Sequence, residues 1–127
     1  MASTLKDMTL NFQKLDKFEG VGFRRWQNKM HSLLTTLNVV YVLTTPWPAL
    51  PQDGEEENLE VTRRRTKWEN DDYICRGHIL NSLSDTLFDL YQNVESAKDL
   101  WDYLEANYIS KNASSKKFLV IILILLE

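Results

Sequence analysis

A stripe of large apolar side chains at helical spacing is the feature that most limits how this sequence can fold. Residues 96–108 read SAKDLWDYLEANY, and their apolar positions recur as one face of an α-helix. The stripe consists of Ala97, Leu100, Trp101, Leu104 and Tyr108. Ser96 precedes it, where a hydroxyl accepts a hydrogen bond from the first turn, and Asp99 lies where the helix dipole favours an acid. The pattern predicts a capped helix that buries one face.

A second amphipathic helix is predicted over residues 22–37. Its apolar positions are separated alternately by three and four residues, which places them on one face. They are Phe23, Trp26, Met30, Leu33 and Leu37. Gly20 and Gly22 stand just before this helix, where we expect the chain to turn.

The middle of the chain is predicted to be a loop followed by two more helices. Residues 38–58 contain three prolines, which cannot continue a helix, and they begin with Val39–Leu43 as either a helical turn or an extended piece. A long helix is expected over residues 59–83, and a short helix over residues 84–91 with Ser84 as its cap. The positions expected to face inward are Val61, Trp68, Cys75, Ile79 and Ser82 or Leu83 in the long helix, and Leu87, Leu90 and Tyr91 in the short one.

The last part of the sequence is unusually apolar. Residues 118–126 are nine consecutive apolar residues, too few to span a bilayer and too uniform for a surface helix. A further helix is expected to begin at Ser114 or Ser115 and to need a partner outside this chain. Left exposed, such a segment favours aggregation.

These patterns predict an all-α fold, a small and irregular orthogonal bundle of about five helices. With 127 residues the chain is long enough for one domain, which we place at 17–120, after a loosely ordered segment 1–16 and before an atypical apolar tail 121–127. Three indoles, those of Trp26, Trp68 and Trp101, are expected to form its centre. The predicted core residues are Phe23, Trp26, Met30, Leu33, Trp68, Ile79, Leu100, Trp101, Leu104 and Tyr108.

Composition limits the compartment and the partners. The single cysteine cannot form an intrachain disulfide, and the first residues lack the apolar core of a signal peptide, so we expect an intracellular, cytoplasmic protein. The sequence has no run of about 18 apolar residues, so no membrane association is expected. The net charge of −3 gives no general attraction to nucleic acid.

Residues with catalytic or metal-binding chemistry are few. Cys75 and His78 have the spacing of half a zinc site, but only His31 remains to extend it, and a buried core cysteine is the preferred interpretation. Asp71 and Asp72 are adjacent, so on a helix they point about 100° apart and are expected on a solvated face. We therefore expect no enzymatic activity, no metal, no cofactor and no small-molecule substrate.

Two features suggest contacts with other molecules. Arg63, Arg64, Arg65 and Lys67 form one basic cluster, which either contacts phosphates or forms a solvated helix face with i,i+4 ion pairs. Acidic residues on both sides of the cluster in the sequence weaken its positive electrostatic field. Trp47, in the proline loop, is the best candidate for an exposed aromatic contact in an assembly interface.

Several motifs occur in an order that carries a family resemblance. F-x-G-x-x-F-x-x-W occupies Phe18 to Trp26, and a helix containing Trp68 follows. I-x-x-S-L-S-D begins at Ile79, and A-K-x-L-W-x-x-L-x-x-x-Y ends at Tyr108. In this order and spacing, residues 14–120 resemble the N-terminal Gag region of Copia-type LTR retrotransposons, and the sequence is most similar to plant elements.

The resemblance implies a helical, capsid-like assembly domain without catalytic activity that associates with copies of itself. In such elements the Gag shell encloses RNA, which is usually bound by a CCHC zinc knuckle. The single cysteine of this sequence cannot supply such a knuckle, so only weak RNA contact is expected. After SSKKFLV the family would continue as a longer amphipathic helix, and the sequence IILILLE instead suggests a truncated or domesticated remnant. The alternatives are a domesticated helical adaptor that binds another protein, and a weak nucleic-acid binder acting through Arg63–Lys67.

Overall fold

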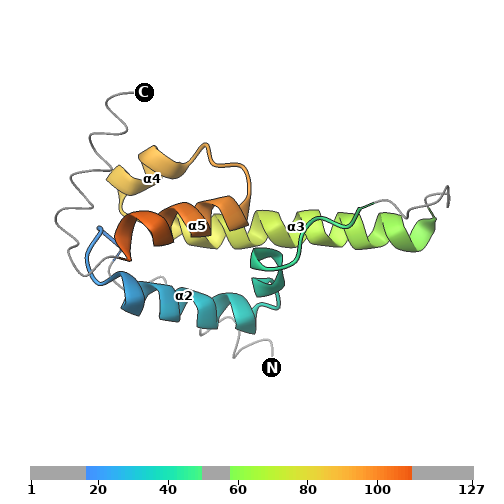
Figure 1. The fold of residues 1–127 in the computed structure, drawn as a ribbon, viewed down its shortest axis with the longest axis horizontal. Coiled ribbons are helices and arrows are strands. Elements are labelled where there is room, and N and C mark those ends of the chain that lie inside the picture. Colours follow the sequence, from blue (N-terminus) through green and yellow to red (C-terminus); the bar gives the residue numbers. More distant parts are fainter. Residues whose placement is uncertain (1–16, 50–57, 110–127) are drawn as a thin grey trace.

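The structure, a computed structural model, describes residues 17–49 and 58–109 (Figure 1). This part of the chain folds into α-helices joined by short loops and one 3-10 helix, so the prediction of an all-α fold is confirmed. The elements are α2 (Phe23–Thr36), the 3-10 helix η1 (Val40–Leu43), α3 (Leu59–Asn81), α4 (Asp85–Tyr91) and α5 (Ala97–Tyr108). The helix expected after Ser114 or Ser115, the segment 1–16 and the tail 121–127 lie outside the described residues.

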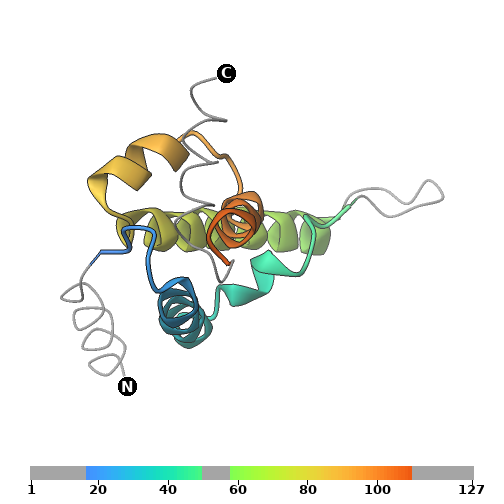
Figure 2. The ribbon, with the colours of Figure 1, turned by 60° about the vertical axis from the view of Figure 1, so that its left-hand side comes forward.

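The long helix α3 organises the bundle. Its carboxyl-terminal half is flanked by α2, α4 and α5, while its amino-terminal half projects beyond these helices (Figure 1). Seen after a turn of the molecule, α2 and α5 are both viewed nearly end-on, α2 below α3 and α5 in front of it (Figure 2). The 3-10 helix η1 contacts α2, α3 and α5. None of the helices in the described part of the chain has the length and apolarity needed to cross a membrane.

Side-chain caps fix where three helices begin. Ser84 and Ser96 accept hydrogen bonds from the backbone N–H groups of Leu87 (3.4 Å) and Asp99 (3.0 Å), as the sequence predicts. Asn58 caps α3 in the same way, with a bond of 2.9 Å from the N–H of Val61. That cap was not predicted, although asparagine is among the residues most favoured there. Gly22 starts α2 with a φ of 73°, a left-handed conformation that glycine adopts without strain.

The inward helix faces meet in one apolar core. Among the ten expected core residues, Trp68 and Trp101 are half-buried and pack against the core from its edge. The other eight are buried: Phe23, Trp26, Met30, Leu33, Ile79, Leu100, Leu104 and Tyr108. Leu90 is not turned inward as predicted but is 38% exposed, because α4 is short and faces the core with Leu87 and Tyr91.

An aromatic cluster around Phe18 takes the central place that was expected for three indoles. The Phe18 ring stacks on Trp26 at 5.2 Å and meets Phe23 and Tyr108 edge-on at 5.8 and 5.3 Å. Its backbone accepts from Ser84 N and donates to Ser82 O, each at 2.9 Å, which joins the start of the domain to the α3–α4 connection. The F-x-G-x-x-F-x-x-W motif is therefore a packing unit in this fold.

Trp68 is separate from the other two indoles. The rings of Trp26 and Trp101 lie 5.8 Å apart, whereas the Trp68 indole donates to Thr45 O at 2.9 Å, at the edge of the bundle. The prediction of a single three-indole centre is wrong for Trp68. Helix α3 is so long that Trp68 lies about two turns before Cys75 and about three turns before Ile79, which are fully buried.

Candidate functional site

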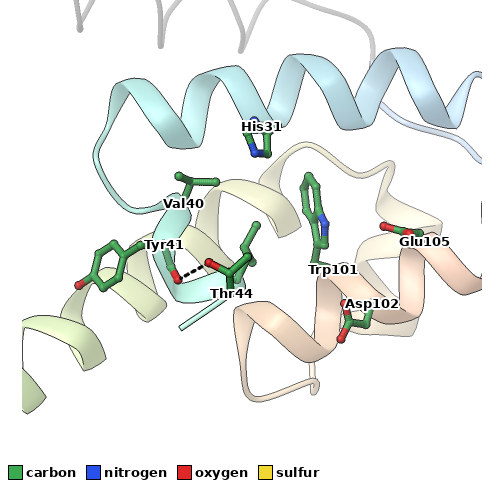
Figure 3. Close-up of a pocket in the computed structure, with 8 residues that line it drawn as sticks. His31, Val40, Tyr41, Thr44, Trp101, Asp102 and Glu105 are labelled. Carbon is green, nitrogen blue, oxygen red and sulfur yellow. Dashed lines mark hydrogen bonds between the residues drawn. The ribbon is translucent and has the colours of Figure 1, made fainter. Parts of the chain in front are cut away.

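An open pocket lies between α2, η1 and α5 (Figure 3). Its volume is about 360 Å³, enough for one or two side chains of a partner. Helix α5 lies far along the sequence from α2 and η1, which follow one another closely, so the pocket exists only in the folded chain. It is lined by His31, Val40, Tyr41, Leu43, Thr44, Trp101, Asp102 and Glu105.

The pocket combines aromatic surface with acidic groups. The rings of His31 and Trp101 both line it, tilted at 51° to one another with their centroids 6.5 Å apart. Glu105 accepts a hydrogen bond of 2.8 Å from Gln27, and Asp102 pairs with the exposed Lys98 at 2.7 Å. Among the described residues no hydrogen bond joins His31 to either carboxylate. The aromatic surface beside the two carboxylates is suited to hold a flat cation.

A polar cluster joins η1 to α3 beside this pocket. The Tyr41 hydroxyl donates to Asp71 Oδ2 at 2.5 Å, and Lys67 donates to the same oxygen at 2.6 Å. Burial would raise the pKa of Asp71, but the hydrogen bonds from Lys67 and Tyr41 outweigh it and hold this pKa below its ordinary value. Burial and the bond to Asp71 raise the pKa of Tyr41. The cluster therefore keeps Asp71 ionised as part of the fold.

The prediction that Asp71 and Asp72 lie on a solvated helix face is wrong. Asp71 is buried, and Asp72 is half-buried and accepts a hydrogen bond of 3.0 Å from Ala97 N at the start of α5. Burial raises the pKa of Asp72, although the bond from Ala97 opposes that shift. Each aspartate ties α3 to a different neighbouring element.

Residues 45–48, which we call the strap, fold back along the amino-terminal half of α3. Arg65 donates to Pro48 O at 2.9 Å, and its guanidinium lies over the Trp47 ring at 4.5 Å. Trp47 donates to Glu69 at 3.1 Å and keeps 45% of its surface exposed. Trp47 is therefore exposed, as expected, and also anchors the strap.

The four residues of the predicted basic cluster lie in two different environments in the structure. Arg65 and Lys67 are engaged by the strap and by Asp71, and the Lys67–Asp71 contact is an i,i+4 ion pair of the predicted kind. Arg63 and Arg64 are exposed and make no hydrogen bond or ion pair with the described residues. The spacing of Lys67 and Asp71 is readable in the sequence, but nothing there indicates that Arg65 meets residues 47 and 48.

The cysteine and histidines lie in different environments. Cys75 is fully buried, and this burial raises the pKa of its thiol to about 12. His78 is half-buried, which lowers its pKa, while His31 faces the pocket from α2. Within residues 17–49 and 58–109 no three histidine, cysteine or acidic side chains are grouped to hold a metal ion.

Some large apolar side chains remain outside the core. They occur on the helices and on the connecting segments, which distributes them over several parts of the surface. The exposed ones are Val21, Trp47, Leu59, Tyr73, Leu90 and Tyr103.

Comparison with known families identifies the chain. A family model described as gag-polypeptide of LTR copia-type matches residues 30–126, from the middle of α2 through α5 and into the apolar tail. Neither the curated proteins nor the solved structures give a match. Because the family match covers far more than half of the sequence, this protein belongs to the copia-type gag polypeptides of LTR retrotransposons.

Proposed function

We propose that this Gag-derived protein is a non-enzymatic structural protein that associates with copies of itself through its helical surfaces. Family membership supports a structural role, because gag polypeptides of this type form a structural, non-catalytic family. Repeated weak contacts between identical subunits generate rings or extended assemblies.

The exposed tyrosines on α3 and α5 are the observation that carries this proposal. Tyr73 and Tyr103 are 73% and 51% exposed, and each stands on a helix whose opposite side is packed into the core. Such positions are rigid, because the helix is held by Ile79 or Leu100 on its buried side. Tyrosines are enriched in protein interfaces, where they contribute strongly to binding.

The roles of the reactive side chains favour a structural protein over an enzyme. Asp71 and Asp72 join helices, and the Cys75 thiol is protonated within the core. A nucleophile needs an accessible, activated form, which burial of Cys75 opposes. The groups that a sequence search singles out for chemistry are thus used to hold the fold.

The test is the mass of the purified chain as a function of concentration, measured by sedimentation velocity and light scattering. We expect the average mass to rise with concentration, and the double variant Tyr73→Ser, Tyr103→Ser to shift this rise to higher concentration. Asn28→Ala, at an exposed position of α2, is the matched control and should behave as the unchanged chain. A strict monomer at the highest attainable concentration contradicts the proposal.

Exposure of Arg63 and Arg64 supports nucleic-acid contact as the second candidate function. Only these two members of the basic cluster are without an intramolecular partner among the described residues, so the contact would involve few phosphates. RNA affinity should then fall only shallowly with salt concentration. Absence of binding at low salt excludes this candidate. A pull-down that recovers one stoichiometric protein would instead support an adaptor.

A further inference from the structure

We propose that copies of this chain join head to tail, with Arg63 or Arg64 of one copy entering the pocket between α2, η1 and α5 of the next. This inference rests on the proposed self-association and adds one specific contact to it. Two different surfaces of the same chain form the contact: the projecting half of α3 and the pocket of Figure 3.

The pocket has the chemistry that recognises an arginine side chain. The Trp101 indole and the His31 ring provide flat surfaces on which a guanidinium stacks. Asp102 and Glu105 provide carboxylates at the same pocket, and a guanidinium donates to carboxylates with two N–H groups at once. The volume of about 360 Å³ accommodates a guanidinium with part of its aliphatic stem.

The same chain already holds an arginine in this way. The Arg65 guanidinium lies 4.5 Å from the centre of the Trp47 ring while its Nε donates to Pro48 O. That contact shows how an arginine on α3 is retained by an indole together with an oxygen acceptor. The pocket offers an indole and charged acceptors, which attract a cation more strongly than a carbonyl does.

The charges of the two surfaces are complementary. Residues 59–70, the projecting part of α3, contain four basic and two acidic side chains. Helix α5 contains three acidic side chains and one basic side chain, Lys98. Charges of this kind guide two surfaces together and set their relative orientation. Arg63 and Arg64 are exposed on the part of α3 that extends beyond the other helices, so a neighbouring molecule can reach them (Figure 1).

Because the two surfaces differ, each contact leaves an arginine pair at one end and a pocket at the other. A contact of this type continues into a ring or an open chain and does not stop at a two-fold dimer. It therefore makes a prediction that a symmetric interface does not make: two variants, each defective in a different surface, restore one contact when mixed.

The experiment uses the full chain with charge-removing substitutions of similar size. One variant carries Arg63→Gln and Arg64→Gln, and the other carries Asp102→Asn and Glu105→Gln. Arg25→Gln with Lys29→Gln, at exposed positions on α2, removes as much charge as the first pair and serves as the control. Circular dichroism melting establishes that all variants are folded.

We expect each test variant to need at least about tenfold higher concentration than the control to self-associate in sedimentation velocity, which is about 1.4 kcal/mol. An equimolar mixture of the two variants should associate at a lower concentration than either variant alone, because the intact arginines of one variant fit the intact pocket of the other. Unchanged association in both test variants overturns the head-to-tail contact while leaving the proposed function intact. Loss of association without rescue on mixing also overturns it.

A monomeric unchanged chain contradicts the proposed function, and this proposal falls with it. In that case a synthetic arginine-containing peptide, added while Trp fluorescence is followed, separates two explanations. Quenching that the pocket variant lacks would show that the pocket receives an arginine from another protein, and no quenching would show that it receives none.

Discussion

The two halves of α3 belong to one continuous helix but are held in different ways. In the carboxyl-terminal half, Cys75, Ile79 and Leu80 are buried against α2, α4 and α5. In the amino-terminal half, backbone carbonyls of the strap accept hydrogen bonds from Arg65 and Trp68, and the Tyr41 hydroxyl of η1 accepts one from Lys67. Leu59, at the very start, is 65% exposed.

Because of this difference, the carboxyl-terminal half of α3 provides stability and the amino-terminal half provides side chains that are accessible to a partner. Apolar burial is non-directional and contributes roughly 25 cal/mol per Å² of apolar surface removed from water, so the carboxyl-terminal half sustains the fold. Exposed polar contacts contribute little each, so the amino-terminal half carries side chains that a partner can engage at small cost to stability. The predictions that follow test this division.

Ile79→Ala should have the largest effect on stability. The side chain is fully buried, so its truncation removes apolar contacts and leaves a cavity, at a cost of about 2–5 kcal/mol. The measurement is urea denaturation followed by circular dichroism. Tyr73→Ala on the same helix is the control, because an exposed position changes stability by about 0.5 kcal/mol or less. Equal effects of the two substitutions would remove the basis of the comparison.

Trp68→Phe should release the strap without unfolding the bundle. The substitution keeps an aromatic ring but removes the N–H that donates to Thr45 O, at a cost of about 1 kcal/mol. Limited proteolysis should then cleave near residues 45–48 faster than in the unchanged chain. An unaltered cleavage rate would mean that Arg65 and Trp47 hold the strap by themselves.

Asp71→Asn should make the stability less dependent on pH. The pKa of Asp71 in the folded chain lies below its ordinary value of 3.8, so its contribution is present above that value and is lost as the pH falls through the folded pKa. Urea denaturation should therefore show a difference in stability between the variant and the unchanged chain at neutral pH, and this difference should narrow as the pH falls below 3.8. Asp89→Asn, which removes a carboxylate at an exposed position of α4, is the control.

The rate at which a reagent labels Cys75 should report how closed the carboxyl-terminal half is. The thiol is fully buried and its pKa is raised to about 12, so a thiol reagent at mildly alkaline pH should react only when the helices open. Denatured protein should react at the rate of a free thiol. Equally fast reaction of folded and denatured protein would show that this half of α3 is open to solvent.

Much of the fold could be predicted from the sequence because helices are encoded locally. The period of apolar residues located α2 and α5 to within a residue or two, and Ser84 and Ser96 marked where helices begin. The same capping rule applies to Asn58, but the proline-rich and acidic residues before it obscured the position at which α3 begins. The order of motifs also led to the correct family.

The candidate site was less predictable. The basic cluster is visible in the sequence, but its division into exposed Arg63 and Arg64 and engaged Arg65 and Lys67 depends on where the loop of residues 45–48 returns. The pocket joins residues from α2, η1 and α5, and no local pattern connects His31 with Trp101.

The sequence by itself determined which segments are helical, where three of them start and which faces are apolar, because these properties follow from spacing within a few residues. Only the tertiary structure decided that Phe18 replaces Trp68 in the aromatic centre, that Asp71 and Asp72 join helices, and that α3 projects from the bundle. The physical reason is that a polar or aromatic side chain is satisfied by whichever group packing brings within contact distance, and that group lies elsewhere in the chain.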